Sequence, residues 1–195
     1  MKLANMSLTD YIKKAEDTSS VPGGGSIAAL CGALAASLAA MVLNLSKAED
    51  KAADYGKFSE ILQKNIDDDS TSFDDVLKAF RMAKTTEEEK KIRALAIEEG
   101  YKRAIDVPLS TMEAVLGVIE TLKAQEEFIG DEALSDLTMA ADLALTAFNG
   151  AKDTAMLNVA ALKNEATKSV YREKIQAMTE VMVEVHGDVR AFHRA

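Results

Sequence analysis

The stretch VPGGGSIAALCGALAASLAAMVLNLS, residues 21–46, decides the fold of this chain. It contains a glycine triplet, and no charged residue occurs between Asp17 and Lys47. Small residues recur at helical spacing, so we predict a helix that starts near Ser26 and is buried on most of its circumference. Short side chains let neighbouring backbones approach closely, which places this helix at the centre of a bundle or in a subunit interface.

The same stretch is long enough to cross a bilayer, but its composition favours a buried helix of a soluble protein. Alanine, serine and glycine insert weakly into membranes. The preceding SLTDYIKKAEDT reads as an amphipathic helix capped by Ser7, not as the basic region of a signal peptide. With a single cysteine, Cys31, no internal disulfide is possible. We therefore expect a cytoplasmic protein without a membrane partner.

Length and charge limit the function classes further. The chain has 195 residues, and we predict one domain over 1–195. A net charge of -9 argues against a nucleic-acid partner and is compatible with a cationic substrate. His186 and His193 form no zinc-binding or haem-binding pattern, so no metal site is expected.

Helical periodicity dominates, and no segment alternates as a strand would. The expected helices span residues 7–17, 26–46, 51–83, 86–126, 132–164 and 167–194. Thr86 followed by Glu89 predicts a capping box at the start of one of them, and Pro108 is expected to kink or split it. The fold class is therefore all-α: an elongated bundle of about six helices around a buried central helix of small residues.

A carboxylate interrupts the apolar stripe of the helix expected at 51–83. The stripe consists of Leu62, Ile66, Phe73, Val76 and Phe80. Asp69 falls inside this stripe, whereas Asp67 and Asp68 point elsewhere on the helical wheel. A core-facing carboxylate needs a partner, so Asp69 could cap a neighbouring helix or pair with an arginine. Alternatively, it is a general acid/base whose pKa is raised by burial.

The glycine triplet allows two interpretations. Gly23, Gly24 and Gly25 follow Pro22, and free N–H groups at the start of a helix favour an anion or a polar ligand. The alternative is a tight turn that lets two helices touch.

Other polar residues are open in the same way. Arg81 and Lys84 could bind an anionic group or be solvated surface charges. Ser135 and Asp136 read as the start of a helix, with Ser135 as the N-cap. Asn158 lies in the apolar sequence AMLNVAAL and must find a partner, either in the protein or in a ligand.

Taken together, these segments resemble the cyclodeaminase/cyclohydrolase family of folate enzymes. PGGGSIAALCGALAASLAAMVLNLS resembles the family's opening helix. IDDDSTSFDDVLKAFRMAKTTEEEKK contains its D-x-D-x-x-x-F and R-x-x-K-x-T-x-E-E-K segments, and VPL its turn. LSDLTMAAD resembles its [ST]-D helix start, and LNV its N-V motif. The chain departs from the family pattern at Ala83, in the spacing from Ser135 to Asn158, and around Leu162.

The resemblance implies an all-helical dimer that binds folate near the glycine-rich turn. The implied acid/base residues are Asp69, as first choice, and Asp67. The implied substrate-binding residues are Pro22, Gly23, Gly24, Gly25, Ser26, Arg81, Lys84, Ser135, Asp136 and Asn158. No cofactor beyond the folate substrate is implied, and the expected partner is a second copy of the chain.

The implied activity is hydrolysis of 5,10-methenyltetrahydrofolate to 10-formyltetrahydrofolate by general acid/base catalysis. We prefer it because a chain of this length lacks a formiminotransferase unit. The first alternative is a formimidoyltetrahydrofolate cyclodeaminase, which releases ammonia and gives 5,10-methenyltetrahydrofolate. The second alternative is a non-catalytic helical module that binds folate or another protein.

Overall fold

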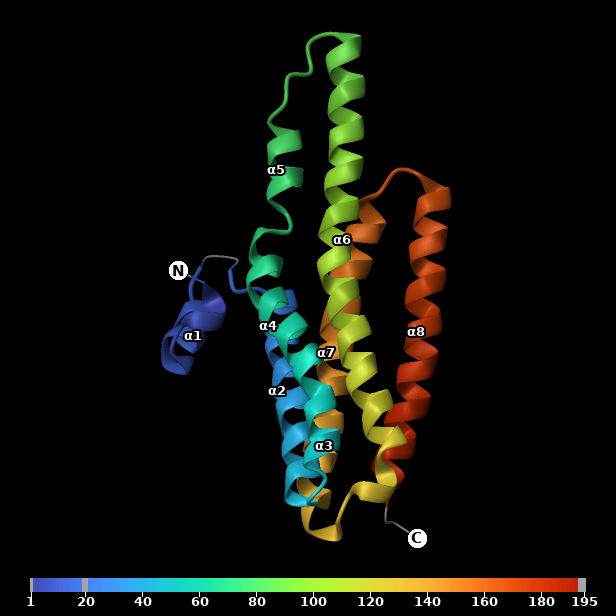
Figure 1. Cartoon of the computed structure of the whole chain (residues 1–195). Helices are drawn as coiled ribbons and strands as arrows, with labels where there is room; N and C mark the ends of the chain where they lie inside the picture. Colours follow the sequence, from blue (N-terminus) through green and yellow to red (C-terminus); the bar gives the residue numbers. More distant parts are fainter. Residues whose placement is uncertain (1, 19–20, 193–195) are drawn as a thin grey trace.

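The computed structural model describes residues 2–18 and 21–192, and within these ranges the chain forms helices and no strand (Figure 1). The α-helices are α1 (Leu8–Ala15), α2 (Gly24–Leu45), α3 (Glu49–Ala52), α4 (Gly56–Thr71), α5 (Asp74–Phe80), α6 (Glu87–Ala124), α7 (Leu134–Ala161) and α8 (Glu165–Ala191). Short 3-10 helices cover Leu3–Asn5, Ala53–Tyr55, Glu126–Phe128 and Asp131–Ala133. The prediction of an elongated all-α bundle is confirmed.

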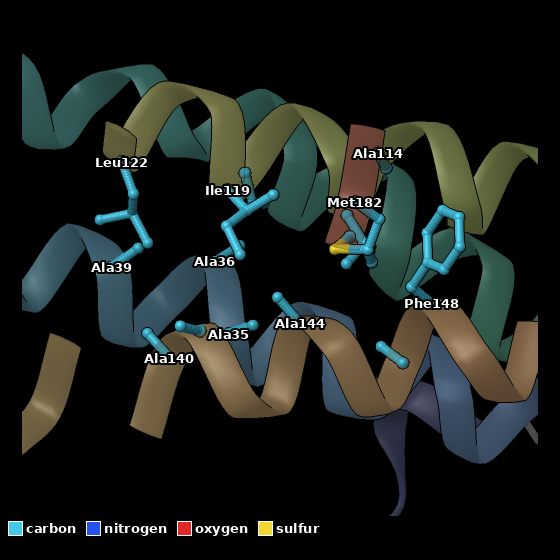
Figure 2. Close-up of a cluster of buried hydrophobic side chains, with 14 of the residues drawn as sticks. Ala35, Ala36, Ala39, Ala114, Ile119, Leu122, Ala140, Ala144, Phe148 and Met182 are labelled. Atoms are coloured by element: carbon cyan, nitrogen blue, oxygen red, sulfur yellow. The ribbon is translucent and has the colours of Figure 1, made fainter. Parts of the chain in front are cut away.

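Helix α2 is the central element, as its sequence predicts. It packs against α7 most extensively, and also against α4 and α6. Alanines form these contacts: Ala35, Ala36 and Ala39 are fully buried. Ala35 lies beside Ala140 and Ala144 of α7, while Ala36 and Ala39 lie next to Ile119 and Leu122 of α6 (Figure 2). Methyl side chains allow the two backbones to approach closely. By length and composition alone α2 could span a membrane, but more than half of its most apolar window is buried in the bundle.

The direction of the helices decides which ends meet. The start of α2 lies near the end of α4, and the end of α2 lies near α3 and the start of α7 (Figure 1). Helix α5 and the first turns of α6 extend beyond the start of α2 as a two-helix arm. Phe73 packs edge-on against Tyr101 of α6 in this arm, with ring centroids 5.8 Å apart.

The helix expected at 51–83 is in fact three α-helices and a 3-10 turn. It breaks after Thr71 because hydroxyl side chains compete for the backbone carbonyls. Ser70 Oγ donates to Asp67 O at 2.6 Å, and Ser72 Oγ donates to Asp69 O at 2.9 Å. The break resets the helical phase, so Phe73 is 39% exposed instead of continuing the buried stripe.

Helix starts were predicted with mixed success. The capping box is confirmed: Thr86 Oγ1 accepts from Glu89 N at 3.1 Å, and Glu89 Oε2 accepts from Thr86 N at 2.9 Å. The helix expected to start near Ser26 begins two residues earlier, because Gly23 has the extended backbone of the cap and α2 begins at Gly24. Ser135 as an N-cap is wrong, because α7 begins one residue earlier, at Leu134.

Pro108 does not split its helix: α6 runs unbroken from Glu87 to Ala124. A proline in a helix has no N–H group for the carbonyl four residues earlier, which here is the buried Ala104 O. Asn158 Nδ2 of α7 donates to this oxygen at 2.9 Å. The proline is tolerated because a side chain of the neighbouring helix satisfies the carbonyl that it leaves free.

This pairing predicts a coupling between Asn158 and Pro108. Asn158→Leu leaves Ala104 O unpaired and should lower the free energy of unfolding by about 1–3 kcal/mol. Combined with Pro108→Ala, which restores an N–H donor for Ala104 O, the same substitution should cost less. Urea unfolding of the two single variants and the double variant measures the difference. Equal costs in both backgrounds would show that the bond does not compensate for the proline.

Candidate active site

Asp69 lies in the last turn of α4 and packs directly on the first turn of α2. A Cβ atom added to Gly25 would lie 2.0 Å from Asp69 Oδ1 and 2.6 Å from Asp69 Cγ. Only a residue without a side chain permits this contact. Gly25 is thus required for space, and the predicted tight contact between two helices occurs here between the glycine and a carboxylate.

Ser26 anchors the same turn of α2 from its other side. Its fully buried hydroxyl donates to Ile66 O of α4 at 2.9 Å. It also lies 3.0 Å from the Tyr11 hydroxyl of α1. Since Ser26 Oγ has one proton and gives it to Ile66 O, Tyr11 is the donor in the second bond. The Ser26 side chain is therefore occupied by protein partners, and three helices meet at this hydroxyl.

Burial raises the pKa of the Asp69 carboxyl, and hydrogen bonding from the Ser26 backbone N–H opposes this in part. Burial also raises the pKa of Tyr11, with further contributions from the nearby Asp69 and Cys31. Among the ion pairs of the described residues none involves Asp69. A half-buried carboxyl with a raised pKa, and with no ion-pair partner among the described residues, suits a general acid/base.

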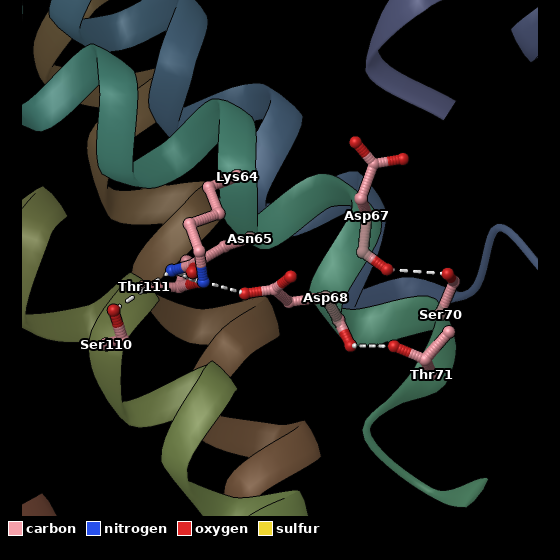
Figure 3. A network of polar contacts seen from close by, with 8 residues as sticks. All are labelled: Lys64, Asn65, Asp67, Asp68, Ser70, Thr71, Ser110 and Thr111. Atoms are coloured by element: carbon pink, nitrogen blue, oxygen red, sulfur yellow. Dashed lines mark hydrogen bonds and ion pairs between the residues drawn. The ribbon is translucent and has the colours of Figure 1, made fainter. Parts of the chain in front are cut away.

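Asp67 is placed differently. Its Oδ1 accepts the Leu3 backbone N–H at 2.5 Å, so it holds the 3-10 helix before α1 against α4. Figure 3 shows Asp67 directed away from α6, while Asp68 is directed toward Lys64 and forms an ion pair with it. The helical wheel predicted that Asp67 and Asp68 point away from the face that carries Asp69, and these positions agree with it.

A buried polar contact joins α4 to α6 one turn before Asp69. Asn65 Nδ2 donates to Thr111 Oγ1 at 3.1 Å and to Ser110 Oγ at 3.2 Å (Figure 3). Because α4 and α6 are antiparallel, Asp69 lies level with Pro108, one turn beyond this contact. Ala104 O, which accepts from Asn158, lies one turn before Pro108 in α6. The structure thus brings the glycine turn, Asp69, Pro108 and Asn158 to one end of the bundle.

Two predicted site residues lie at the opposite end. The 3-10 helix before Ser135 and Asp136 adjoins the end of α2, where Gly130 N donates to Ser46 Oγ at 2.9 Å. The 22 residues of α2 separate this end from Gly25 by about 30 Å. Within one chain, Ser135 and Asp136 therefore do not share a site with Asp69.

Arg81 and Lys84 are not brought beside Asp69 either. Arg81 follows the last residue of α5, and both side chains are exposed. They belong to the end of the two-helix arm, which extends away from the start of α2 (Figure 1). The break after Thr71 leads α5 into this arm, so the two cations that could bind an anionic group lie away from the first turn of α2.

Sequence reasoning missed Tyr11 and Asn65. Tyr11 is the one buried residue of α1, an eight-residue helix that otherwise faces solvent. Asn65 is 4% exposed and lies one helical turn before Asp69. Its position four residues before Asp69 was a usable signal, because polar residues at this spacing share a face of the helix.

One pocket lies beside Tyr11 and another beside Asp67, and Asp69 lines neither of them. A pocket of 150 Å³ is lined by apolar side chains of the first residues, Tyr11, Leu30 and Ile66. A larger groove of 670 Å³ lies between α7 and α8, and none of the predicted site residues lines it. The small pocket is below the usual range of ligand sites, about 300–1,000 Å³.

Comparison with known proteins agrees with the helical architecture. The fold matches the crystal structure of formiminotetrahydrofolate cyclodeaminase from Thermotoga maritima with a TM-score of 0.85 and 21% sequence identity, over 98% of this chain and 97% of that one. The chain is 28% identical over 191 residues to the methenyltetrahydrofolate cyclohydrolase of Methylorubrum extorquens, covering 92% of this chain and 90% of the relative.

Longer relatives match over one part of their length. The chain is 30% identical over 183 residues to the formimidoyltransferase-cyclodeaminase of Mus musculus and 29% identical over 190 residues to that of Sus scrofa. It spans about a third of these two proteins, 33% and 35%. The formiminotransferase-cyclodeaminase family model matches residues 7–177. The chain therefore belongs to the formiminotransferase-cyclodeaminase family.

Proposed function

We propose that this protein hydrolyses 5,10-methenyltetrahydrofolate to 10-formyltetrahydrofolate, with Asp69 as the general acid/base. The observation that carries the proposal is the half-buried Asp69 carboxyl on Gly25, whose pKa is raised and which has no ion-pair partner in the part of the chain that the structure describes. The relative from Methylorubrum extorquens supports the choice of reaction, because the match extends over nearly its whole length.

The substrate holds one carbon between N5 and N10 in an amidinium cation. In the proposed reaction, water adds to this carbon while Asp69 accepts the proton that the water loses. In the tetrahedral intermediate, the C–N5 bond then breaks as the protonated Asp69 returns a proton to N5. The hydroxyl proton of the intermediate leaves to solvent, and the carbon remains on N10 as a formyl group. The Asp69 negative charge also stabilises the cationic substrate.

The proposed substrate contacts are the first turn of α2 and polar groups at the same end of the bundle. Gly24 is exposed at the start of α2, where free N–H groups attract an electronegative group of the ligand. Pro22 and Gly23 shape this turn. Ser26 contributes through its backbone, because its hydroxyl is occupied.

Two turnover assays on the purified protein test the proposal. The first follows loss of the methenyl chromophore from 5,10-methenyltetrahydrofolate above the uncatalysed rate. The second supplies 5-formiminotetrahydrofolate and follows appearance of the chromophore together with ammonia. Acceleration in the first supports the hydrolase. Acceleration in the second alone replaces it with the cyclodeaminase, the activity in the name of the structural neighbour, and silence in both contradicts an enzyme.

We also infer that the protein is a homodimer that pairs through α2. One face of this helix remains apolar and exposed along its whole length: Ile27, Leu34, Met41 and Leu45 are 38–50% exposed. Their spacing of seven and four residues puts them on one stripe. A continuous apolar stripe on the surface is typical of an interaction site. A second copy offers the same charge-free stripe, and a two-fold axis lets identical surfaces pair.

The interface predicts that Leu34→Glu converts the dimer to a monomer, because it would bury an unpaired carboxylate at the centre of the stripe. Analytical ultracentrifugation at micromolar concentration measures the change. Leu157→Glu is the matched control, because this exposed leucine lies on α7, outside the stripe. A monomeric wild-type protein, or equal dissociation of both variants, would contradict the interface.

A further inference from the structure

Helix α1 is attached to the site by one polar side chain. Its buried face consists of Tyr11, which is 7% exposed and packs in a small apolar cluster with Leu3, Ala29 and Ile66. The Tyr11 hydroxyl lies at the inner end of this cluster, where it donates to Ser26 Oγ. A phenylalanine would satisfy the apolar contacts equally well, so the hydroxyl has a purpose beyond packing.

The hydroxyl connects to Asp69 in two steps. Tyr11 binds Ser26 Oγ at 3.0 Å, and Ser26 Oγ binds Ile66 O of α4 at 2.9 Å. These bonds fix the rotamer of Ser26 and the seating of the first turn of α2 on α4. The backbone N–H of the same Ser26 is the group that donates to Asp69. The neighbouring Gly25 contacts the Asp69 carboxylate directly.

We propose that Tyr11 is a positioning residue for Asp69, acting through the Ser26 hydroxyl to hold the start of α2 against the carboxylate. The proposal rests on the function proposed above, since it assigns Tyr11 a part in the proton transfer of Asp69. Tyr11 does not touch the reacting atoms. It determines how well the Ser26 N–H is aimed at Asp69, and hence the proton affinity of the carboxylate.

The ionisable surroundings of Asp69 are few, which makes its titration informative. Tyr11 faces it from α1, and Cys31 of α2 lies near Tyr11. From α6, the residue level with it is the uncharged Pro108, while Asp106 of the same helix interacts electrostatically with Lys174 and Arg103. On α4 itself, Asp67 and Asp68 are held by Leu3 N and Lys64.

The test compares Tyr11→Phe with Tyr55→Phe. Tyr55 is 1% exposed, and its hydroxyl donates to Gln125 Oε1 at 2.9 Å at the other end of the bundle. Each variant therefore loses one buried hydrogen bond and keeps its ring. In Tyr11→Phe, kcat should fall about five- to tenfold with little change in KM. The pH at which kcat/KM increases should be higher than in the wild type. A weaker hydrogen bond from Ser26 N–H to the carboxylate raises the pKa of Asp69.

A titration independent of turnover accompanies the kinetics. The ¹³C carboxyl resonance of Asp69 is assigned by its loss in Asp69→Asn. It should titrate at higher pH in Tyr11→Phe than in the wild type, and at the same pH as the wild type in Tyr55→Phe. An unchanged titration in Tyr11→Phe, or an equal shift in both variants, would overturn the positioning role. If no folate is turned over, the proposed function fails, but the titration still decides whether Tyr11 controls Asp69.

Discussion

Asp69→Asn should reduce turnover of 5,10-methenyltetrahydrofolate by about 10²–10⁴-fold while the protein stays folded. The size follows from the usual contribution of a positioned general acid/base. The amide has the same shape as the carboxyl group and fits over Gly25, but it neither accepts nor returns a proton. Single-turnover and steady-state kinetics with the methenyl chromophore measure the loss.

Asp67→Asn is the matched comparison for this variant. Its amide oxygen can still accept the Leu3 N–H, so turnover should stay within about threefold of the wild type. Loss of activity in Asp67→Asn with retention in Asp69→Asn would exchange the roles of the two carboxylates. Retention in both would remove α4 from the chemistry.

We also expect Asp69→Asn to change how the stability of the protein depends on pH. Burial raises the pKa of Asp69 above its unfolded value, so the folded state binds the proton more tightly. The contribution of Asp69 to stability is therefore fully present below the unfolded pKa and is lost as pH rises through the folded pKa. At neutral pH, Asp69→Asn should be at least as stable as the wild type in urea unfolding. A lower stability at neutral pH would mean that the ionised carboxylate is well stabilised.

Gly25→Ala should reduce kcat by about 10²-fold, because the new methyl group would occupy the position of the Asp69 carboxylate. With Cβ 2.0 Å from Oδ1 and 2.6 Å from Cγ, the whole carboxyl group has to move. The expected cost in stability is small, since alanine is favoured over glycine inside a helix by about 1 kcal/mol, which offsets part of the strain. Activity and stability should therefore separate.

Gly56→Ala is the control for this substitution. Gly56 is also at the start of a helix, α4, and a Cβ atom there meets nothing within 4 Å. It should leave kcat unchanged and raise the free energy of unfolding by about 0.5–1 kcal/mol. If Gly25→Ala keeps full activity, or if both variants lose activity equally, the contact between Gly25 and Asp69 does not position the carboxyl group.

The sequence predicts α2 and the capping of α6 because both signals are local. Twenty-two residues without charge and with alanines at helical spacing allow one conformation, and Thr86 with Glu89 specifies a helix start. The break after Thr71 was also encoded locally, in consecutive hydroxyl residues. The apolar stripe hid this break, because apolar residues spaced three or four apart can continue through it, and the spacing alone does not reveal where the helix ends.

The site was predicted less completely because its parts are joined across helices. The position of Asp69 on the core side follows from periodicity. The contact with Gly25, the Tyr11–Ser26–Ile66 bonds and the use of Asn158 to satisfy Ala104 O depend on how α1, α2, α4, α6 and α7 align. Sequence motifs identify residue types, but they do not show that Ser135 and Asp136 lie at the end of α2 that is about 30 Å from Gly25.

The pairing of α2 with α7 has a consequence for how the protein is made. Tyr11, Gly25, Ser26 and Asp69 all lie in the first 70 residues, whereas the alanines that cover α2 come from α7, about a hundred residues later in the chain. During synthesis from the N-terminus, these residues leave the ribosome early, together with an apolar helix that has no partner yet. They become ordered after α7 has emerged, so a segment that is synthesised well before α7 is completed only once α7 is available.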